Sequence, residues 1–527
     1  MKSLAYLIHG FVFAFGSAII LYAAIDGVNI FVSPRDVVSP ILFSVLAFFL
    51  FVLVGYLATR RLEAAGLIAS LLVLGFFYLW SVFLAIILLT LIGLLAIRVL
   101  YKRFRYADIH LVLNAISVAI VGYYIFQFVT LISGEPWRTA PVTVQPIEGV
   151  QSTIPTQTAT PDIYYIILDG YGRADMLQTL HGFDNSGFVR ALEQRGFVVA
   201  SESQSNYPRT LLSLSSSLNM QYLDAMSSAM GDSHLWWPVS NAVQHSEVRR
   251  ILEDWGYKTV FFANNGDYSD IRDGDFYEAP FSIQLNIFNS RFLNLTNLNL
   301  LAKIDQLGIS DLSYESHRRI ILHSFERLPE VAAIPGPKFV FTHIIAPHPP
   351  YVFDRDGNPL DPPYAFTLSD QMISDVDDSR NGYLEQLEFI NDRMLATIDG
   401  ILANSAAPPI IIIQGDHGPG TRTNYDSAED TCLYERYSIL NAYHLPGVDG
   451  ASIPMDLSPV NTFRFLFNTY FNSDLELLDN RQYFSTSAHF YQFIDVTGQT
   501  EAACVSNSNV VPGQRTSSEP GDLNLKD

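Results

Sequence analysis

The chain has 527 residues, with 53 acidic and 32 basic side chains and a formal net charge of −21. This length exceeds one ordinary domain, and an acidic chain without a basic stripe argues against nucleic acid as a partner. The two cysteines, Cys432 and Cys504, exclude a Cys-based metal or redox motif. They either form one disulfide or remain two unrelated thiols.

The first part of the chain is dominated by long apolar runs. Leu4–Ile25, Pro40–Ala58 and Ile109–Ile132 are each long enough to cross a bilayer core, which takes about 20 residues. Gly66–Ile97 is too long for one span, and we interpret it as two short helices hinged near Trp80–Ser81. A signal peptide is disfavoured, because the apolar runs recur and no small-residue cleavage site follows the first.

The placement of basic residues tests this count of five spans. Arg60-Arg61 and the cluster from Arg98 to Arg105 should both face the cytoplasm. Five spans put both groups on the side of Lys2, whereas four spans would separate them. The sequence therefore predicts a multi-pass protein of the plasma (inner) membrane, with residues 1–133 as the transmembrane domain. A buried all-helical soluble domain is disfavoured, because the runs are too long and uncharged.

Composition divides the remaining chain into three parts. Residues 134–160 are rich in Pro, Thr and Gln, which is typical of a linker, here extracytoplasmic. In residues 161–495, strand-like and helix-like segments alternate. This alternation predicts an α/β domain whose mostly parallel sheet is covered by helices on both faces. Residues 496–527 have the composition of a flexible tail.

Metal-capable side chains follow two of the predicted strands. Ile163–Leu168 leads into Asp169, and Ile410–Ile413 leads into Asp416 and His417. Short β-branched runs bounded by Gly are typical of buried parallel strands, and ligands gather beyond the carboxyl ends of such strands. Carboxylates and an imidazole at that edge suit a divalent cation.

A candidate nucleophile opens a Leu- and Ser-rich segment. The turn at Pro208 places Thr210 near a helix N-terminus, where its oxygen and the free backbone N–H groups could meet an anion. The local sequence by itself favours a plain alternative, in which Thr210 is only the helix N-cap and the serines form a packing face.

Two histidines belong to another predicted strand, Lys338–Ile345, and to the loop that follows it. His348 lies in a Pro-rich loop, which favours a displayed imidazole over a packed one. His343 lies on the strand itself, so a structural role is about as well supported as a functional one. A predicted strand over Tyr437–Tyr443 carries His444 at or just beyond its end.

Taken together, these features resemble the alkaline phosphatase superfamily. The resemblance is to its sulfatase-like membrane branch, the lipoteichoic acid synthases and lipid A phosphoethanolamine transferases, and it covers roughly residues 1–490. It implies five transmembrane helices, a linker and an extracytoplasmic metal-dependent transferase domain.

The resemblance also implies roles for individual residues. Asp169, Thr210, Asp416 and His417 would bind one divalent metal ion, with Zn or Mn favoured and Mg or Ca as further candidates. Thr210 would be the nucleophile, and His348 matches the histidine that contacts the substrate phosphate.

Other residues match the family pattern only weakly or differ from it. Ser213 follows Thr210 at the family spacing, and Arg209, Ser213 and His343 are weak candidates for substrate binding. Asp169 stands where the membrane branch usually has Glu. The chain has no Cys-x-Pro-x-Arg site, which disfavours sulfate ester hydrolysis. His444 is no convincing second metal ligand, which favours one tightly held ion.

The implied activity is transfer of a phospho-head-group, of the phosphoglycerol or phosphoethanolamine type, through a phosphothreonine. The donor would be a phospholipid and the acceptor an envelope glycan or glycolipid. The alternatives are a membrane-anchored phosphodiesterase or sulfatase-like hydrolase, and a non-catalytic binding relative.

Overall fold

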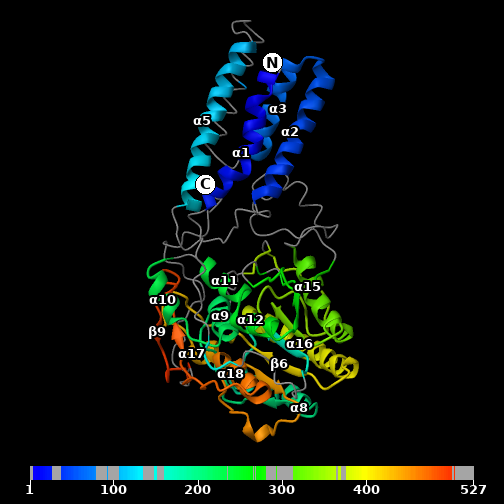
Figure 1. The fold of residues 1–527 in the computed structure, drawn as a ribbon, viewed down its shortest axis with the longest axis vertical. Coiled ribbons are helices and arrows are strands. Elements are labelled where there is room, and N and C mark those ends of the chain that lie inside the picture. Colours follow the sequence, from blue (N-terminus) through cyan, green and yellow to red (C-terminus); the bar gives the residue numbers. More distant parts are fainter. Residues whose placement is uncertain are drawn as a thin grey trace. The chain divides into compact units, whose positions relative to one another are not determined.

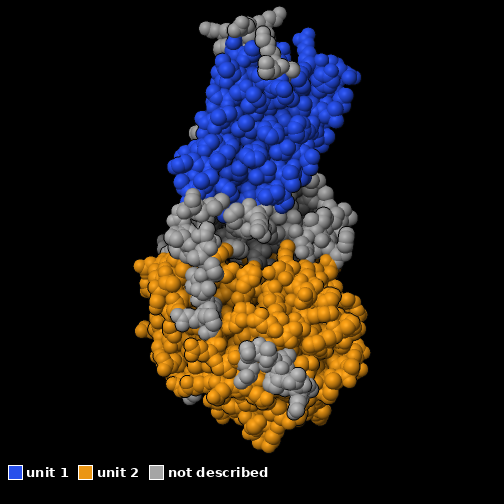
Figure 2. Space-filling view, in the orientation of Figure 1, with its two compact units in different colours: residues 1–139, 283–311, 523–527 blue, residues 140–282, 312–522 orange. Residues whose placement is uncertain are grey.

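The chain forms two compact units, which are coloured separately in Figure 2. The first contains residues 1–139, 283–311 and 523–527, and the second contains residues 140–282 and 312–522. The structure, a computed structural model, describes residues 4–25, 37–78, 92, 106–133, 147–150, 160–233, 236–264, 266, 269–280, 292, 313–363, 366–368, 376–500 and 504.

Apolar helices make up the described part of the first unit (Figure 1). They are η1 (Leu4–Tyr6), α1 (Ile8–Ile25), α2 (Val38–Thr59), α3 (Leu62–Phe77) and α5 (Tyr106–Ser133). Two stretches, Val38–Thr59 and Tyr106–Thr130, are long and apolar enough to cross a membrane, while the apolar stretches of α1 and α3 are shorter. The predicted count of five spans is therefore not confirmed. The proposed hinge at Trp80–Ser81 lies outside the described residues, as does most of the segment from there to Ile97.

Polar and aromatic contacts show that α1 and α5 run parallel. Near their first residues, the backbone N–H of His9 donates to Asn114 Oδ1 at 2.9 Å. Near their last residues, the rings of Tyr22 and Phe128 lie 4.9 Å apart. The two helices therefore begin at the same end of the bundle.

Helix α3 has this same direction. His9 Nδ1 lies 2.5 Å from Ser70 Oγ, and the hydroxyl of Tyr78, just beyond α3, donates to Phe13 O at 2.5 Å. Helices α1 and α3 therefore run parallel to each other. The chain consequently leaves α3 at one end of the bundle and enters α5 at the other.

A twisted sheet organises the second unit. Among the described residues it has seven strands in the order β2-β7-β6-β1-β5-β3-β4. Their bounds are β1 Ile163–Leu168, β2 Val198–Val199, β3 Lys258–Phe262, β4 Phe276–Glu278, β5 Lys338–Ile344, β6 Ile410–Gln414 and β7 Asn441–His444. Strands β6, β1, β5, β3 and β4 pair in parallel, whereas β7 pairs antiparallel with both of its neighbours, β6 and β2. A separate hairpin joins β8 (Tyr483–Phe484) and β9 (Ile494–Asp495).

Helices cover both faces of this sheet, which confirms the predicted α/β class (Figure 1). The helical segments are α7 Ala174–Met176, η4 Leu177–His181, α8 Ser186–Glu193, α9 Thr210–Asn219, α10 Asp224–Met230, α11 Trp237–Gln244, α12 Glu247–Asp254, α15 Tyr314–Arg327, η6 Glu330–Ala333, α16 Val376–Asn404, α17 Leu433–Tyr437, η8 Gly450–Ser452 and α18 Pro459–Phe471.

The central strand β1 shows how the two layers are built. All six of its residues are buried, as expected for a parallel strand covered on both sides. Tyr165 points to one face, where its ring meets Phe463 of α18 at 5.0 Å and its hydroxyl donates to Ser217 of α9. Ile166 points to the other face and belongs to an apolar cluster with Ile390 of α16. Alternation along β1 therefore fixes α9 on one side and α16 on the other.

The segment before β7 corrects one prediction. Tyr437–Tyr443 was expected to be a strand, but Tyr437 ends α17 and β7 begins only at Asn441. Cys432 at the start of α17 forms a disulfide with Cys504, with the two Cα atoms 5.4 Å apart. This settles the alternative that the sequence left open.

Candidate metal and nucleophile site

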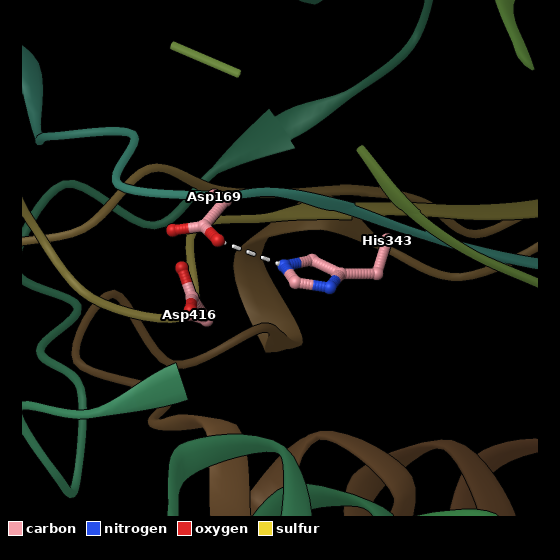
Figure 3. A group of neighbouring side chains, drawn as sticks. All are labelled: Asp169, His343 and Asp416. Carbon is pink, nitrogen blue, oxygen red and sulfur yellow. Dashed lines mark hydrogen bonds and ion pairs between the residues drawn. The ribbon is translucent and has the colours of Figure 1, made fainter. Parts of the chain in front are cut away.

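Asp169 extends from the carboxyl end of β1 into the site. Its backbone N–H donates to Ile344 O on the neighbouring strand at 3.0 Å, which continues the ladder by one step. The side chain is 2% exposed, and Oδ2 lies 3.1 Å from His343 Nε2. Figure 3 shows this contact, with the carboxyl groups of Asp169 and Asp416 turned toward each other.

Asp416 and His417 follow β6, the other neighbour of β1. Gly170 N–H donates to Asp416 Oδ1 at 3.0 Å, so the loop after β1 holds this carboxylate directly. The hydroxyls of Ser205 and Ser213 both donate to the Asp416 carbonyl at 2.7 Å. Asp416 is thus oriented through both its side chain and its backbone.

Thr210 is the first residue of α9, and its hydroxyl oxygen lies 3.0 Å from His417 Nε2. The N-cap position belongs to Arg209, which has extended backbone angles and no capping side-chain bond. The plain alternative for Thr210, a helix N-cap, is therefore wrong. The hydroxyl faces the acidic edge of the sheet.

The same imidazole nitrogen brings the predicted ligands together. His417 Nε2 lies 3.2 Å from Asp416 Oδ2 and 3.7 Å from Asp169 Oδ1. His417 Nδ1 lies 3.0 Å from Gly418 O, which can only accept, so Nδ1 carries the proton and Nε2 has a free lone pair. Thr210, Asp169, Asp416 and His417 therefore converge on one point.

Two oxygens of this cluster fit a bound cation. Asp169 Oδ1 and Asp416 Oδ2 are buried and, within the described part of the chain, have no hydrogen-bond partner. Buried carboxylate oxygens without donors are costly unless a cation neutralises them. Oxygen and imidazole donors suit a divalent ion. One atom each from Asp169, His343 and Asp416 also lies within 4.8 Å of the others, so His343 is a further candidate ligand.

The pKa values of these groups follow from burial and from one another. Burial and the neighbouring Asp169 carboxylate raise the pKa of Asp416 to about 6. Burial also raises the pKa of Asp169, but His348, His343 and His417 outweigh that effect and hold its pKa well below the ordinary value. Burial, and then the charge of Arg436, lower the pKa of His417. The imidazole is therefore neutral, as a metal ligand must be.

A family model described as sulfatase matches residues 161–446, more than half of the 527 residues. The chain belongs to the sulfatase family. This membership confirms the predicted enzyme of the alkaline phosphatase superfamily. No protein of curated function matches the chain by sequence.

Solved structures with a similar fold include three bacterial proteins. The C-terminal periplasmic domain of EptC from Escherichia coli, in complex with Zn, is 13% identical, with a TM-score of 0.44, over 70% of this chain and 100% of that one. The C-terminal periplasmic domain of the phosphoethanolamine transferase EptC from Campylobacter jejuni is 14% identical, with a TM-score of 0.37, over 62% and 94%. Phosphonate monoester hydrolase of Agrobacterium radiobacter is 14% identical, with a TM-score of 0.40, over 62% and 80%. Family membership rests on the family model alone, because sequence identities and TM-scores this low carry no information about a shared activity.

His348 approaches the site of this sulfatase-family domain from the loop after β5. Its backbone N–H donates to Asp169 O at 3.0 Å, and its ring centre lies 6.4 Å from that of His417. The ring is half-buried, with Nδ1 2.5 Å from Pro349 O. The structure thus brings His348 beside the predicted ligands.

The weaker sequence candidates have other contacts. The Arg209 guanidinium stacks on Tyr425, with 4.5 Å to the ring centre, and donates to Ser487 at 3.1 Å. The Ser213 hydroxyl is directed at the Asp416 backbone. His343 contacts Asp169 through Nε2, and its Nδ1 lies 2.9 Å from Ser269 Oγ.

Sequence reasoning missed Ser205, Ser269 and Arg436, which contact the residues of the site. Ser205 holds the Asp416 backbone, Ser269 orients His343, and Arg436 donates to Gly418 O. A signal for Ser205 existed, since it lies five residues before the candidate nucleophile. The other two belong to segments without a recognisable pattern.

Proposed function

We propose that this protein is a membrane-anchored, metal-dependent phosphotransferase. It moves a phospho-head-group, of the phosphoglycerol or phosphoethanolamine type, from a phospholipid to a glycan or glycolipid of the cell envelope. The observation that carries the proposal is the 3.0 Å approach of Thr210 Oγ1 to His417 Nε2, beside two buried carboxylates. A hydroxyl aligned with a cation site is the arrangement that nucleophilic catalysis on a phosphate ester requires.

Asp169, Asp416 and His417 would hold one divalent ion, with Thr210 as the fourth donor; Zn and Mn are the first candidates, and Mg and Ca are the others. Such an ion, when bound, lowers the pKa of a neighbouring hydroxyl and stabilises charge on phosphoryl oxygens. Thr210 also begins helix α9, whose first-turn N–H groups favour an anion.

The reaction proceeds in two displacements at phosphorus. Thr210 Oγ1 forms a bond to phosphorus and loses its proton, while the bond to the lipid oxygen breaks and the lipid alcohol takes up a proton. An acceptor hydroxyl then attacks the phosphothreonine and releases Thr210. His348 contacts the phosphoryl oxygens and stabilises their charge in both steps.

Membrane anchoring places the site where a lipid donor is concentrated. Two stretches of the first unit have the length and composition of spans. We propose five spans within residues 1–133, a linker over 134–160, a catalytic domain over 161–495 outside the cytoplasm and a flexible tail over 496–527. The directions of α3 and α5 support an odd count, since α3 ends at the opposite end of the bundle from the one at which α5 begins.

A phosphodiesterase that uses water as the acceptor is the second candidate. One sequence feature favours it, namely the Asp at position 169, where the transferases that the chain resembles usually have Glu. The two candidates share the first displacement and differ only in what attacks the phosphothreonine.

Intact-protein mass spectrometry with lipid analysis tests the proposal. The purified full chain is incubated in detergent with labelled phosphatidylglycerol or phosphatidylethanolamine and divalent metal. We expect diacylglycerol release and a head-group phosphate adduct on Thr210, absent in Thr210→Ala. Ser215→Ala, on the same helix, is the matched control and should retain the adduct. Release of free head-group phosphate without transfer to any acceptor would favour the phosphodiesterase. Absence of lipid turnover would overturn both.

A further inference from the structure

The short helix α17 lies directly against the loop that carries His417. Gly418 N–H donates to Arg436 O at 2.7 Å. A Cβ atom at position 418 would lie 2.0 Å from Glu435 O, so only glycine permits this approach. The loop and the helix therefore meet backbone to backbone.

The side chain of Arg436 makes a second connection at the same place. It is 2% exposed, and its three nitrogens donate to Gly418 O at 3.0 Å, to Pro208 O at 2.7 Å and to Tyr425 Oη at 2.6 Å. A buried guanidinium requires such acceptors, and its planar fork fixes their relative positions. Two of the three are backbone carbonyls of the loops that form the site.

The Gly418 carbonyl connects Arg436 to the metal ligand. It accepts from Arg436 Nη1 and also from His417 Nδ1, at 3.0 Å each. The proton on Nδ1 leaves Nε2 free to face Asp169, Asp416 and Thr210. Partners of this kind orient ligating histidines and tune metal affinity. Arg436 therefore holds the Gly418 carbonyl in place, and this carbonyl in turn orients the imidazole of His417.

The Pro208 carbonyl connects Arg436 to the nucleophile. Pro208 lies two residues before Thr210, in the turn that enters α9. The bond from Arg436 Nε therefore sets where α9 begins. One buried side chain thus links the turn before Thr210 to the residue after His417.

We propose that Arg436 is a positioning residue, which holds the nucleophile Thr210 and the ligand His417 in register by donating to Pro208 O and Gly418 O. This rests on the proposed function, because it assigns Arg436 to a metal and nucleophile site. Arg436 does not touch substrate or the reacting atoms.

The test compares Arg436→Lys and Arg436→Met with a matched pair, Arg464→Lys and Arg464→Met. Arg464 on α18 also donates to two backbone carbonyls, Met220 O at 2.7 Å and Glu476 O at 2.8 Å, but it is no part of the site. Zn and Mn dissociation constants of the full-length apo protein, thermal midpoints, kcat and KM are measured for each variant.

We expect the Arg436 variants to bind metal about 10- to 100-fold more weakly, to lose kcat and to keep KM within about twofold. The Arg464 variants should match wild type in metal affinity and kcat, even where their thermal midpoints fall. Guanidinium added to Arg436→Met should restore part of the metal affinity.

Three results would overturn the inference. Unchanged metal affinity in both Arg436 variants would show that the contacts do not orient His417. A raised KM with unchanged kcat would place Arg436 in substrate binding. Failure of both variants to fold, judged by circular dichroism, would make Arg436 a folding determinant. Failure of the proposed function is distinguishable, because wild type would then bind no metal or release no lipid product.

Discussion

Thr210 Oγ1 lies 3.0 Å from His417 Nε2 although 207 residues separate them in the chain. Both are buried, and each belongs to a segment held by backbone bonds at a strand or helix end. A contact between a hydroxyl and an imidazole beside two carboxylates requires several segments of the chain to be placed accurately.

Asp416→Asn should destroy the metal site and yet stabilise the metal-free protein. The folded-state pKa of Asp416, about 6, lies above its ordinary value of 3.8. The metal-free protein therefore loses stability through this group as pH rises from about 4 to about 6. The amide retains an acceptor for Gly170 and removes the charge, so near neutral pH the variant should gain about 2 to 3 kcal/mol.

Thermal unfolding in EDTA, near pH 4 and near neutral pH, checks this prediction. The difference between wild type and Asp416→Asn should be close to zero at the lower pH. Added Zn or Mn should reverse the order, because wild type gains about 4.1 kcal/mol at a metal concentration of about 1,000 Kd. A variant less stable than wild type in EDTA near neutral pH would contradict the account.

His348→Ala should impair phosphate handling more than metal binding. The contact of His348 with Asp169 uses the backbone N–H, which the substitution leaves in place. We expect kcat/KM to fall about 100-fold, in the range found for loss of one electrostatic stabiliser, with an unchanged metal dissociation constant. His444→Ala is the control, since His444 ends β7 and contacts Pro409 O away from the site. Loss of metal from His348→Ala would assign this histidine to the ligands instead.

Gly418→Ala should be among the most damaging small substitutions in the chain. The new methyl group would meet Glu435 O at 2.0 Å, so the loop must move away from α17. We expect a loss of about 2 to 3 kcal/mol in unfolding free energy, together with weaker metal binding. Gly187→Ala is the contrasting control: its Cβ would meet nothing within 4 Å in helix α8, so it should gain about 0.5 to 1 kcal/mol. Urea unfolding of both variants provides the comparison.

Removal of the disulfide should destabilise the second unit, and loss of either cysteine should cost as much unfolding free energy as loss of both. Cys432 and Cys504 are 72 residues apart, and a bridge of this span is worth about 4 kcal/mol in the chain-entropy model. Cys432→Ala, Cys504→Ala and the double variant should therefore each lose the same amount of unfolding free energy, measured by urea unfolding. Single variants as stable as oxidised wild type would show that the bridge contributes nothing.

Much of the site was predictable because its residues follow strongly patterned strands. The apolar runs before Asp169 and Asp416 identify buried parallel strands, and the fold brings the ends of such strands to one edge. Thr210 was identifiable from the Pro turn before it, although the turn alone did not exclude a cap.

The remaining residues depend on pairings that one chain does not reveal. His343 reaches Asp169 because β1 and β5 pair with Ile167 opposite His343, and a shift of one residue would turn the imidazole to the other face. The Tyr437–Tyr443 prediction failed because its β-favouring residues were read without their tertiary context. Arg436 is buried through bonds to Pro208 and Gly418, 228 and 18 residues away in the sequence, and it belongs to α17, the helix that ends at Tyr437.

The position of β1 between β5 and β6 has a consequence for how the protein matures. Asp169 comes from the first strand of the domain and Asp416 from a strand completed nearly 250 residues later. A chain that has been synthesised only as far as β5 therefore lacks half of its acidic oxygens and the imidazole of His417. Metal capture and a reactive Thr210 can arise only after the sheet has closed around β1. Under the proposed function, an immature chain would therefore be unable to attack a lipid.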